Sequence, residues 1–161
     1  MQFPLGVPVP TADLKPETSV PRTPAFVGDR LALQSVPGIG PLTATALGAT
    51  ATDISSFHSD RQFAAWLGLT PRQTGTGGEI RQLGISKKCD PYVRTLLMHG
   101  ARAIIARTQR TGWITALLAR RPYSVVVAAL ANKLARTAWV VLTKAQAFDQ
   151  LKWNLADTVT A

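Results

Sequence analysis

Apolar side chains recur every three or four residues over much of the chain, which is the spacing of one buried face of an α-helix. The clearest helix start is Asp90-Pro91, an N-capping carboxylate followed by proline at the first helical position. One buried face is predicted to follow, and Arg94 and Arg102 lie off it. The residues of that face are Val93, Leu96, Leu97, Gly100 and Ile104.

A second long helix is predicted from about Pro122 to Ala147, after a short helix from Ile114 to Ala119. A single basic stripe on such a helix is usually solvated, but basic stripes on two adjacent helices favour a partner of negative charge. The predicted inward stripe contains Val127, Leu130, Leu134 and Val141. The predicted basic stripe, on another side, contains Lys133, Arg136 and Lys144.

Shorter helices are expected nearer the N-terminus. One covers Asp29 to Ser35, with Leu31 and Leu33 partly inward. Another covers Asp60 to Leu67, where Ser59 serves as the N-cap and Gly68 ends the helix. Helical spacing turns the nearby aromatic side chains inward, so we interpret them as core residues. They are Phe57, Phe63 and Trp66.

The segment from Pro37 to Leu47 resembles a helix–hairpin–helix, in which a Gly-x-Gly turn precedes a helix with closely spaced small residues. Backbone N–H groups of Gly38, Ile39 and Gly40 would then meet a phosphate oxygen at the start of that helix. Pro41 suits the first helical position. The same sequence also occurs as a plain turn between packed helices, and this alternative stays open.

The stretch from Trp66 to Asp90 carries the densest candidate chemistry. A flexible backbone at Gly75 to Gly78 is surrounded by cations and hydroxyls, a combination that suits a phosphodiester. The alternative is a solvated loop between helices. The cations are Arg72, Arg81, Lys87 and Lys88, and the hydroxyls are those of Thr74, Thr76 and Ser86.

A short hairpin fits Gly78 to Ile85, and no other segment shows strand-like alternation over more than a few residues. The predicted fold class is therefore mainly α. We expect a helical domain with a helix–hairpin–helix and a Gly-rich basic loop or short hairpin between helices.

Composition supports one domain with a core, since 46% of the 161 residues are hydrophobic. Residues 1–28 hold six of the eleven prolines and are predicted to form a disordered leader. The domain is expected over 29–148, followed by a tail over 149–161.

The formal net charge of +9 is unevenly distributed. From Arg72 to Lys144 there are thirteen Lys or Arg and two acids, a net of +11, while five bases and seven acids elsewhere give −2. This asymmetry favours nucleic acid as the partner, over the alternative of a generally basic protein.

Residues for other kinds of chemistry are sparse. Cys89 is the single cysteine, His58 and His99 are far apart, and the acids are scattered, so no metal site or cofactor is predicted in this chain. No signal peptide is apparent, and the apolar run from Ser124 to Ala131 is too short to span a bilayer. We expect a cytoplasmic protein without a membrane partner.

The remaining chemical option is a hydroxyl nucleophile in a cationic, Gly-rich loop. Neighbouring Arg or Lys side chains would neutralise charge that develops on phosphorus in the transition state. Thr76 and Ser86 are the candidates on this reasoning.

Three runs of sequence resemble the C-terminal domain of the insertion-sequence-one-ten transposase family, especially its eleven-eleven branch. They are VPGIGPLTATAL, FHSDRQFAAWLGLTPRQTGTGGEIRQLGISKKCDPYVRTLLMHGARA and RRPYSVVVAALANKLARTAWVVL. The resemblance covers roughly Leu31 to Phe148, and the order of GLTPRQ, the Gly-Gly turn, LGISK and LANKLAR is specific to it.

The resemblance implies a recombinase whose N-terminal domain binds Mg through an acidic tetrad. It also implies a serine in the C-terminal domain that attacks DNA and forms a covalent phosphoserine link. DNA is the implied partner, a structured guide RNA takes part in some members, and the active unit is a multimer.

Two departures from the family pattern bear on activity. The family usually reads Ser-Ser-Gly-Gly-Lys where this chain reads Gly75-Thr76-Gly77-Gly78-Glu79, so the nucleophile position falls on Thr76. The β-methyl group of threonine crowds the approach to phosphorus, and Glu79 replaces a usual cation with an anion. The acidic N-terminal domain is not found in these residues.

The resulting prediction is a DNA-binding transposase domain, truncated and weakened, whose partners are DNA, other copies or an intact transposase. Three alternatives stay open: a non-catalytic DNA or RNA binder, an enzyme in which threonine works, and a fragment without function. The predicted nucleic-acid contacts are Gly38, Ile39, Gly40, Arg72, Gly77, Gly78, Arg81, Ser86, Lys87, Lys88 and Arg94, with Thr76 as the catalytic residue.

Overall fold

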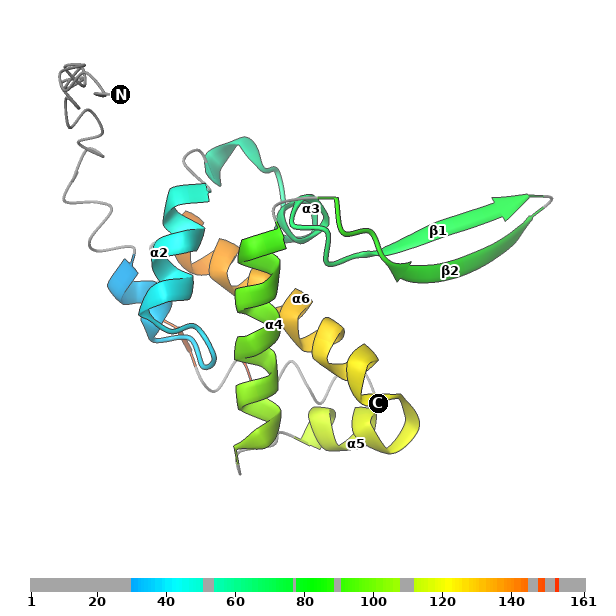
Figure 1. Ribbon diagram of the computed structural model, residues 1–161. Helices are drawn as coiled ribbons and strands as arrows, with labels where there is room; N and C mark the ends of the chain where they lie inside the picture. Colours follow the sequence, from blue (N-terminus) through cyan, green and yellow to red (C-terminus); the bar gives the residue numbers. More distant parts are fainter. Residues whose placement is uncertain are drawn as a thin grey trace, which may run out of the picture.

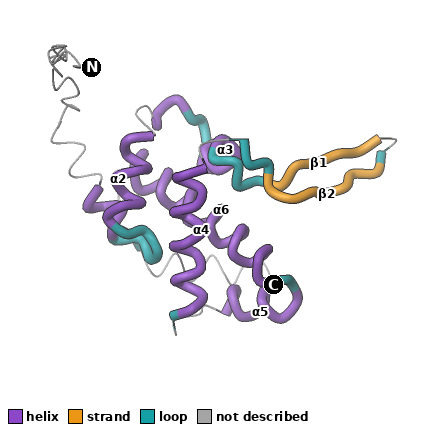
Figure 2. Tube along the Cα trace, viewed as in Figure 1, coloured by secondary structure: helices purple, strands orange, loops and turns teal. Residues whose placement is uncertain are grey.

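The computed structural model describes residues 30–50, 54–76, 78–88, 91–107, 112–144, 148–149 and 153. The predicted leader and most of the predicted tail lie outside these residues. The described part is mainly helical, as predicted, with one two-stranded antiparallel sheet (Figures 1 and 2). Its elements after a short helix at 30–34 are α2 (Pro41–Thr50), the 3₁₀ helix η1 (Ile54–Ser56), α3 (Asp60–Trp66), β1 (Pro71–Thr76), β2 (Glu79–Ile85), α4 (Pro91–Ala106), α5 (Gly112–Arg120) and α6 (Tyr123–Lys144).

The core forms where α3 and α4 pack on α6. In Figure 1, α6 crosses behind α4, and α5 lies near the beginning of α6. In the same view, α2 and α5 lie on opposite sides of α4. The predicted inward stripe of α6 is confirmed, because Val127, Leu130, Leu134 and Val141 are all buried. On α4, the predicted face contributes Val93 and Leu97, and Ala101 and Ile105 join them.

Within the described residues, α6 is long and apolar enough, by length and composition alone, to cross a membrane, with a mean hydropathy of 1.6. The apolar window is therefore longer than the run from Ser124 to Ala131. A core helix of a folded domain passes the same test, and the buried side of α6 packs on α3 and α4.

The N-terminal helices pack around a turn that faces inward. Leu33 is fully buried, whereas Leu31 is 64% exposed, so the expectation for Leu31 was wrong. Gly38 has a φ of +81° and lies against α4, where a Cβ would come within 2.7 Å of Ile104 Cδ1 and 2.9 Å of the Gly100 carbonyl oxygen. Only glycine fits this close approach. The two helices and their turn are present, but the helix–hairpin–helix as a DNA-binding motif stays a prediction.

The helix α3 begins as predicted. The Ser59 side chain accepts a hydrogen bond from the Gln62 N–H at 3.2 Å, which satisfies a donor that the helix itself leaves unpaired. Leu67 is the C-cap, and Gly68 follows with a φ of +71°. Phe63 is fully buried and stacks near Trp66, at 5.9 Å between ring centroids. The aromatic cluster is therefore core, although Trp66 keeps 37% exposure.

Candidate nucleic-acid interface

The Gly-rich stretch folds into a hairpin that extends from the helical body (Figures 1 and 2). Strands β1 and β2 pair with Gln73 opposite Gln82, Thr74 opposite Arg81 and Thr76 opposite Glu79. Two glycines join Thr76 to Glu79, and Gly78 has a φ of +88°. The hairpin is longer than predicted, because a short hairpin was expected within Gly78 to Ile85, whereas its first strand is Pro71–Thr76 and Glu79–Ile85 forms the second strand alone.

The hairpin buries almost nothing of itself. Every side chain of β2 is exposed except that of Ile85, which is half-buried, and Ile80 and Leu83 keep 69% and 45% exposure. The described side chains of β1 are exposed as well. A two-stranded ribbon without a covered face is only marginally stable in water, so this element suits a surface that is covered by a partner.

Backbone contacts anchor the base of the hairpin to the body. The Ser86 N–H donates to the Thr70 carbonyl at 2.9 Å, and the Lys87 N–H donates to the Gly68 carbonyl at 3.2 Å. A Cβ on Gly68 would come within 2.7 Å of the Lys88 nitrogen. Lys87 itself adopts the left-handed conformation, with a φ of 56°. The chain before β1 and the chain after β2 are thus held together tightly where the hairpin leaves the core.

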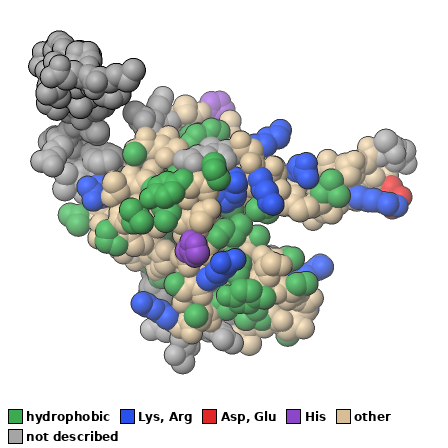
Figure 3. All heavy atoms as spheres, viewed as in Figure 1, with side chains coloured by type: hydrophobic (Ala, Val, Ile, Leu, Met, Phe, Trp, Pro, Cys, Tyr) green, Lys and Arg blue, Asp and Glu red, His purple; other side chains and the backbone are tan. Residues whose placement is uncertain are grey.

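Basic side chains follow the hairpin from its tip to its base. Figure 3 shows Lys and Arg side chains spread along this element, with an acidic side chain near its far end. Arg81 forms an ion pair with Glu79 at 3.4 Å, but the two side chains are 74% and 73% exposed, so the pair contributes little stability. Arg72, Lys87 and Lys88 are also exposed. Arg72 and Arg81 therefore lie on the projecting strands, and Lys87 and Lys88 lie where the hairpin joins the core.

The structure does not bring all predicted contacts to this hairpin. Gly38 and Ile39 pack against the core, Gly40 is exposed, and their turn lies on the other side of α4 from the hairpin (Figure 1). Arg94 is half-buried on α4. Gly77 and the side chain of Thr76 lie outside the described residues, although the Thr76 backbone belongs to β1.

Ser86 lies in the hairpin base rather than on an open surface. Its hydroxyl oxygen is buried and has no hydrogen-bond partner in the described part of the chain. A hydroxyl in that position is less accessible to a phosphate than one near the turn of the hairpin. The Ser86 hydroxyl is therefore not presented to a phosphate in this structure.

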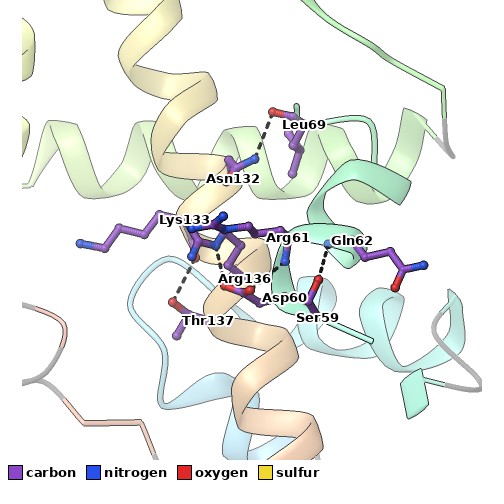
Figure 4. A network of polar contacts seen from close by, with 9 residues as sticks. All are labelled: Ser59, Asp60, Arg61, Gln62, Leu69, Asn132, Lys133, Arg136 and Thr137. Carbon is purple, nitrogen blue, oxygen red and sulfur yellow. Dashed lines mark hydrogen bonds and ion pairs between the residues drawn. The ribbon is translucent and has the colours of Figure 1, made fainter. Parts of the chain in front are cut away.

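The predicted basic stripe of α6 is not a free face. Arg136 Nε donates to Asp60 Oδ2 of α3 at 2.6 Å, and Asn132 Nδ2 donates to the Leu69 carbonyl at 3.3 Å (Figure 4). Lys133 points away from both in Figure 4 and lies 4.3 Å from the centroid of the Trp153 ring. The Asn132 and Arg136 contacts hold the start of α3 and the base of the hairpin on the core. Of the three stripe residues, only Lys144 is exposed.

The Asp60–Arg136 pair is expected to contribute about 1 kcal/mol of coupling energy, since the two side chains are only 25% and 43% exposed. A double-mutant cycle with Asp60→Asn and Arg136→Gln, followed by urea unfolding, measures this coupling. The exposed Glu79–Arg81 pair is the matched control, where Glu79→Gln and Arg81→Gln should show coupling near zero. Additive effects in the Asp60–Arg136 cycle would mean that the contact does not position α3.

Within the described residues, no group of three or more His, Cys, Asp or Glu side chains could hold a metal ion. The resemblance implies Mg in a different domain of the family, and the carboxylates described in this chain are not grouped to hold such an ion.

Comparison with known proteins places the chain among the transposases by sequence similarity. The family model described as "Transposase IS116/IS110/IS902 family" matches residues 30–116, more than half of the chain, and the chain belongs to this family. The matched segment contains the hairpin, α3 and α4.

Several curated transposases are similar to the chain. A probable family 20 transposase of Pseudomonas aeruginosa is 51% identical over 117 residues, covering 70% of this chain and 35% of that protein. The transposase for insertion sequence element IS1111A of Coxiella burnetii is 41% identical, covering 72% of this chain and 33% of that protein. The transposase for IS1328 of Yersinia enterocolitica is 42% identical, covering 73% and 37%. The chain thus spans about a third of the length of these relatives.

Proposed function

We propose that the chain is a DNA-binding transposase domain, formed by residues 29–148, that inserts its basic hairpin into a groove of duplex DNA. The supporting observation is a two-stranded ribbon that is exposed on both faces and carries Arg72 and Arg81, with Lys87 and Lys88 exposed where the ribbon joins the core. The major groove of B-DNA admits a two-stranded ribbon, and phosphates flank it on both sides. Cations at the tip and at the base of the hairpin would meet phosphates along the groove wall.

The proposed chemistry in DNA transposition is attack by the Thr76 hydroxyl on a backbone phosphorus. The Thr76 oxygen forms a bond to phosphorus as the bond to one bridging oxygen breaks, and the released oxygen takes up a proton equivalent to the one that threonine loses. Glu79 pairs with Thr76 across the turn and brings a negative charge close to the reacting phosphate. This charge opposes attack, so we propose that the chain acts weakly unless other copies or an intact transposase complete the active unit.

A second candidate is a non-catalytic DNA or RNA binder that regulates transposition by occupying sites. The Glu79–Arg81 contact favours it, because Glu79 partly neutralises the cation closest to the turn. Both candidates use the same hairpin surface, and a structured RNA would compete for it.

Denaturing gels distinguish these two candidates. The chain is mixed with labelled DNA that carries the ends of an insertion element, and covalent adducts are detected on the gel. We expect a trace of heat-stable protein–DNA adduct, which Thr76→Ser raises about tenfold, because serine removes the β-methyl group that crowds the phosphorus. Thr76→Ala should abolish the adduct and leave non-covalent affinity within about twofold. Absence of any adduct, including with Thr76→Ser, would leave the non-catalytic binder.

A further inference from the structure

A groove of about 1610 Å³ opens beside the base of the hairpin. One wall comes from the hairpin, through Leu83 and its neighbours, and another comes from α4. The rest of the lining includes most of the length of α6, Trp113 of α5 and three residues after α6, which are Phe148, Asp149 and Trp153. This volume exceeds that of ordinary small-molecule pockets and suits an extended chain. In Figure 3, apolar side chains lie beneath the hairpin, with basic side chains on either side of them.

The groove combines exposed apolar surface with exposed cations. Tyr123 is 50% exposed, Val125 is 48% exposed and Leu83 is 45% exposed. Arg102 and Arg121 also line the groove, are exposed, and form no ion pair within the described part of the chain. The groove carries four Lys or Arg and two Asp in total, a net of +2, and one of those carboxylates already pairs with Arg136.

We infer that this groove binds an unpaired DNA strand, an inference that rests on the proposed function and extends it. A duplex presents phosphates and base edges, and its base faces are hidden by stacking. An unpaired strand exposes those faces, which stack on aromatic side chains while the backbone follows a basic groove. Tyr123 offers the aromatic face, Arg102 and Arg121 offer the charge, and Leu83 with Met98 supplies apolar surface.

Continuity with the hairpin favours DNA over an acidic peptide as the occupant. Pro71 and the segment 82–85 belong both to the hairpin and to the wall of the groove. A strand that separates from a duplex held by the hairpin would therefore enter the groove without crossing another surface. The groove would keep the separated strand beside the base of the hairpin.

Fluorescence anisotropy with the full chain tests this assignment, using labelled oligo-dT and a blunt duplex of equal length. Tyr123→Ala is expected to weaken oligo-dT binding about tenfold, the loss of one stacking contact, and Arg102→Ala with Arg121→Ala about as much. Duplex affinity should stay within about twofold, because duplex binding uses the hairpin. Tyr123→Phe keeps the aromatic face and should retain oligo-dT affinity.

Tyr92→Ala is the matched control, since Tyr92 is 52% exposed but does not line the groove. Equal loss of oligo-dT and duplex binding in Tyr123→Ala would overturn the inference, as would an unchanged affinity for oligo-dT. Tighter binding of oligo-rU than of oligo-dT would overturn the assignment to DNA. Failure of wild type to bind the duplex, with oligo-dT binding intact, would instead count against the hairpin function alone.

Discussion

Reversing the charge of two adjacent lysines, through Lys87→Glu with Lys88→Glu, is expected to lower affinity for duplex DNA by about a hundredfold or more. Both side chains are exposed at the base of the hairpin. A charge-assisted contact contributes about 1.5–3 kcal/mol, so two such contacts correspond to at least this factor. The slope of log affinity against log salt should fall by about 2, since about 0.9 counterion is released for each neutralised phosphate. An anisotropy titration over a salt series measures both quantities.

A control variant with the same change in net charge distinguishes a defined interface from non-specific electrostatic attraction. Arg107→Glu with Lys144→Glu changes the net charge by the same amount, at exposed positions near the ends of α4 and α6. We expect this variant to lose less than about threefold in affinity at moderate salt, where distant charges are screened. Equal losses in the two variants would show that DNA responds to net charge and would remove the hairpin from the interface.

The helices could be predicted because burial leaves a periodic mark on the sequence. Val127, Leu130, Leu134 and Val141 recur at helical spacing, and all four are buried in α6. Proline at the first helical position likewise marked the beginning of α4. Such signals are local, so they need no knowledge of the rest of the fold.

The first strand of the hairpin was not predicted, because it has no buried face that would leave a pattern in the sequence. A strand is recognised by alternation when one of its faces is buried, and Pro71–Thr76 has exposed side chains wherever they are described. An element that has no core side carries no hydrophobic pattern. The candidate interface was recognisable from its glycines and cations, but its shape was not.

The roles of the polar residues in α6 depended on distant partners. Helical spacing placed Lys133 and Arg136 off the apolar stripe, and they were interpreted as a surface for a partner. Arg136 instead contacts Asp60, which is 76 positions away in sequence, and Lys133 contacts the Trp153 carbonyl. A polar residue beside a buried stripe can serve either purpose, and only tertiary structure distinguishes them.

The contact between two glycines is the sharpest example of such a tertiary effect, and it supports a large stability prediction. A Cβ on Gly100 would collide with the carbonyl oxygen of Gly38, which belongs to the backbone and cannot rotate away. Gly100→Ala is therefore expected to lower the free energy of unfolding by about 3 kcal/mol, the upper part of the range for overpacking. Urea unfolding measures this change, and the melting temperature should fall by about 10 °C.

Gly112→Ala provides the matched control, because a Cβ at Gly112 meets nothing within 4 Å and the residue belongs to a helix. Alanine favours helix over glycine by up to about 1 kcal/mol, so this variant should be as stable as wild type or slightly more stable. Alanine has the same helix-favouring effect at Gly100. The measured decrease in the free energy of unfolding for Gly100→Ala is therefore a lower bound on the free energy needed to separate α4 from the turn at Gly38. Equal stability of Gly100→Ala and wild type would mean that α4 and this turn do not pack as described. The backbone at Gly38 would then be accessible for the predicted contact with a phosphate.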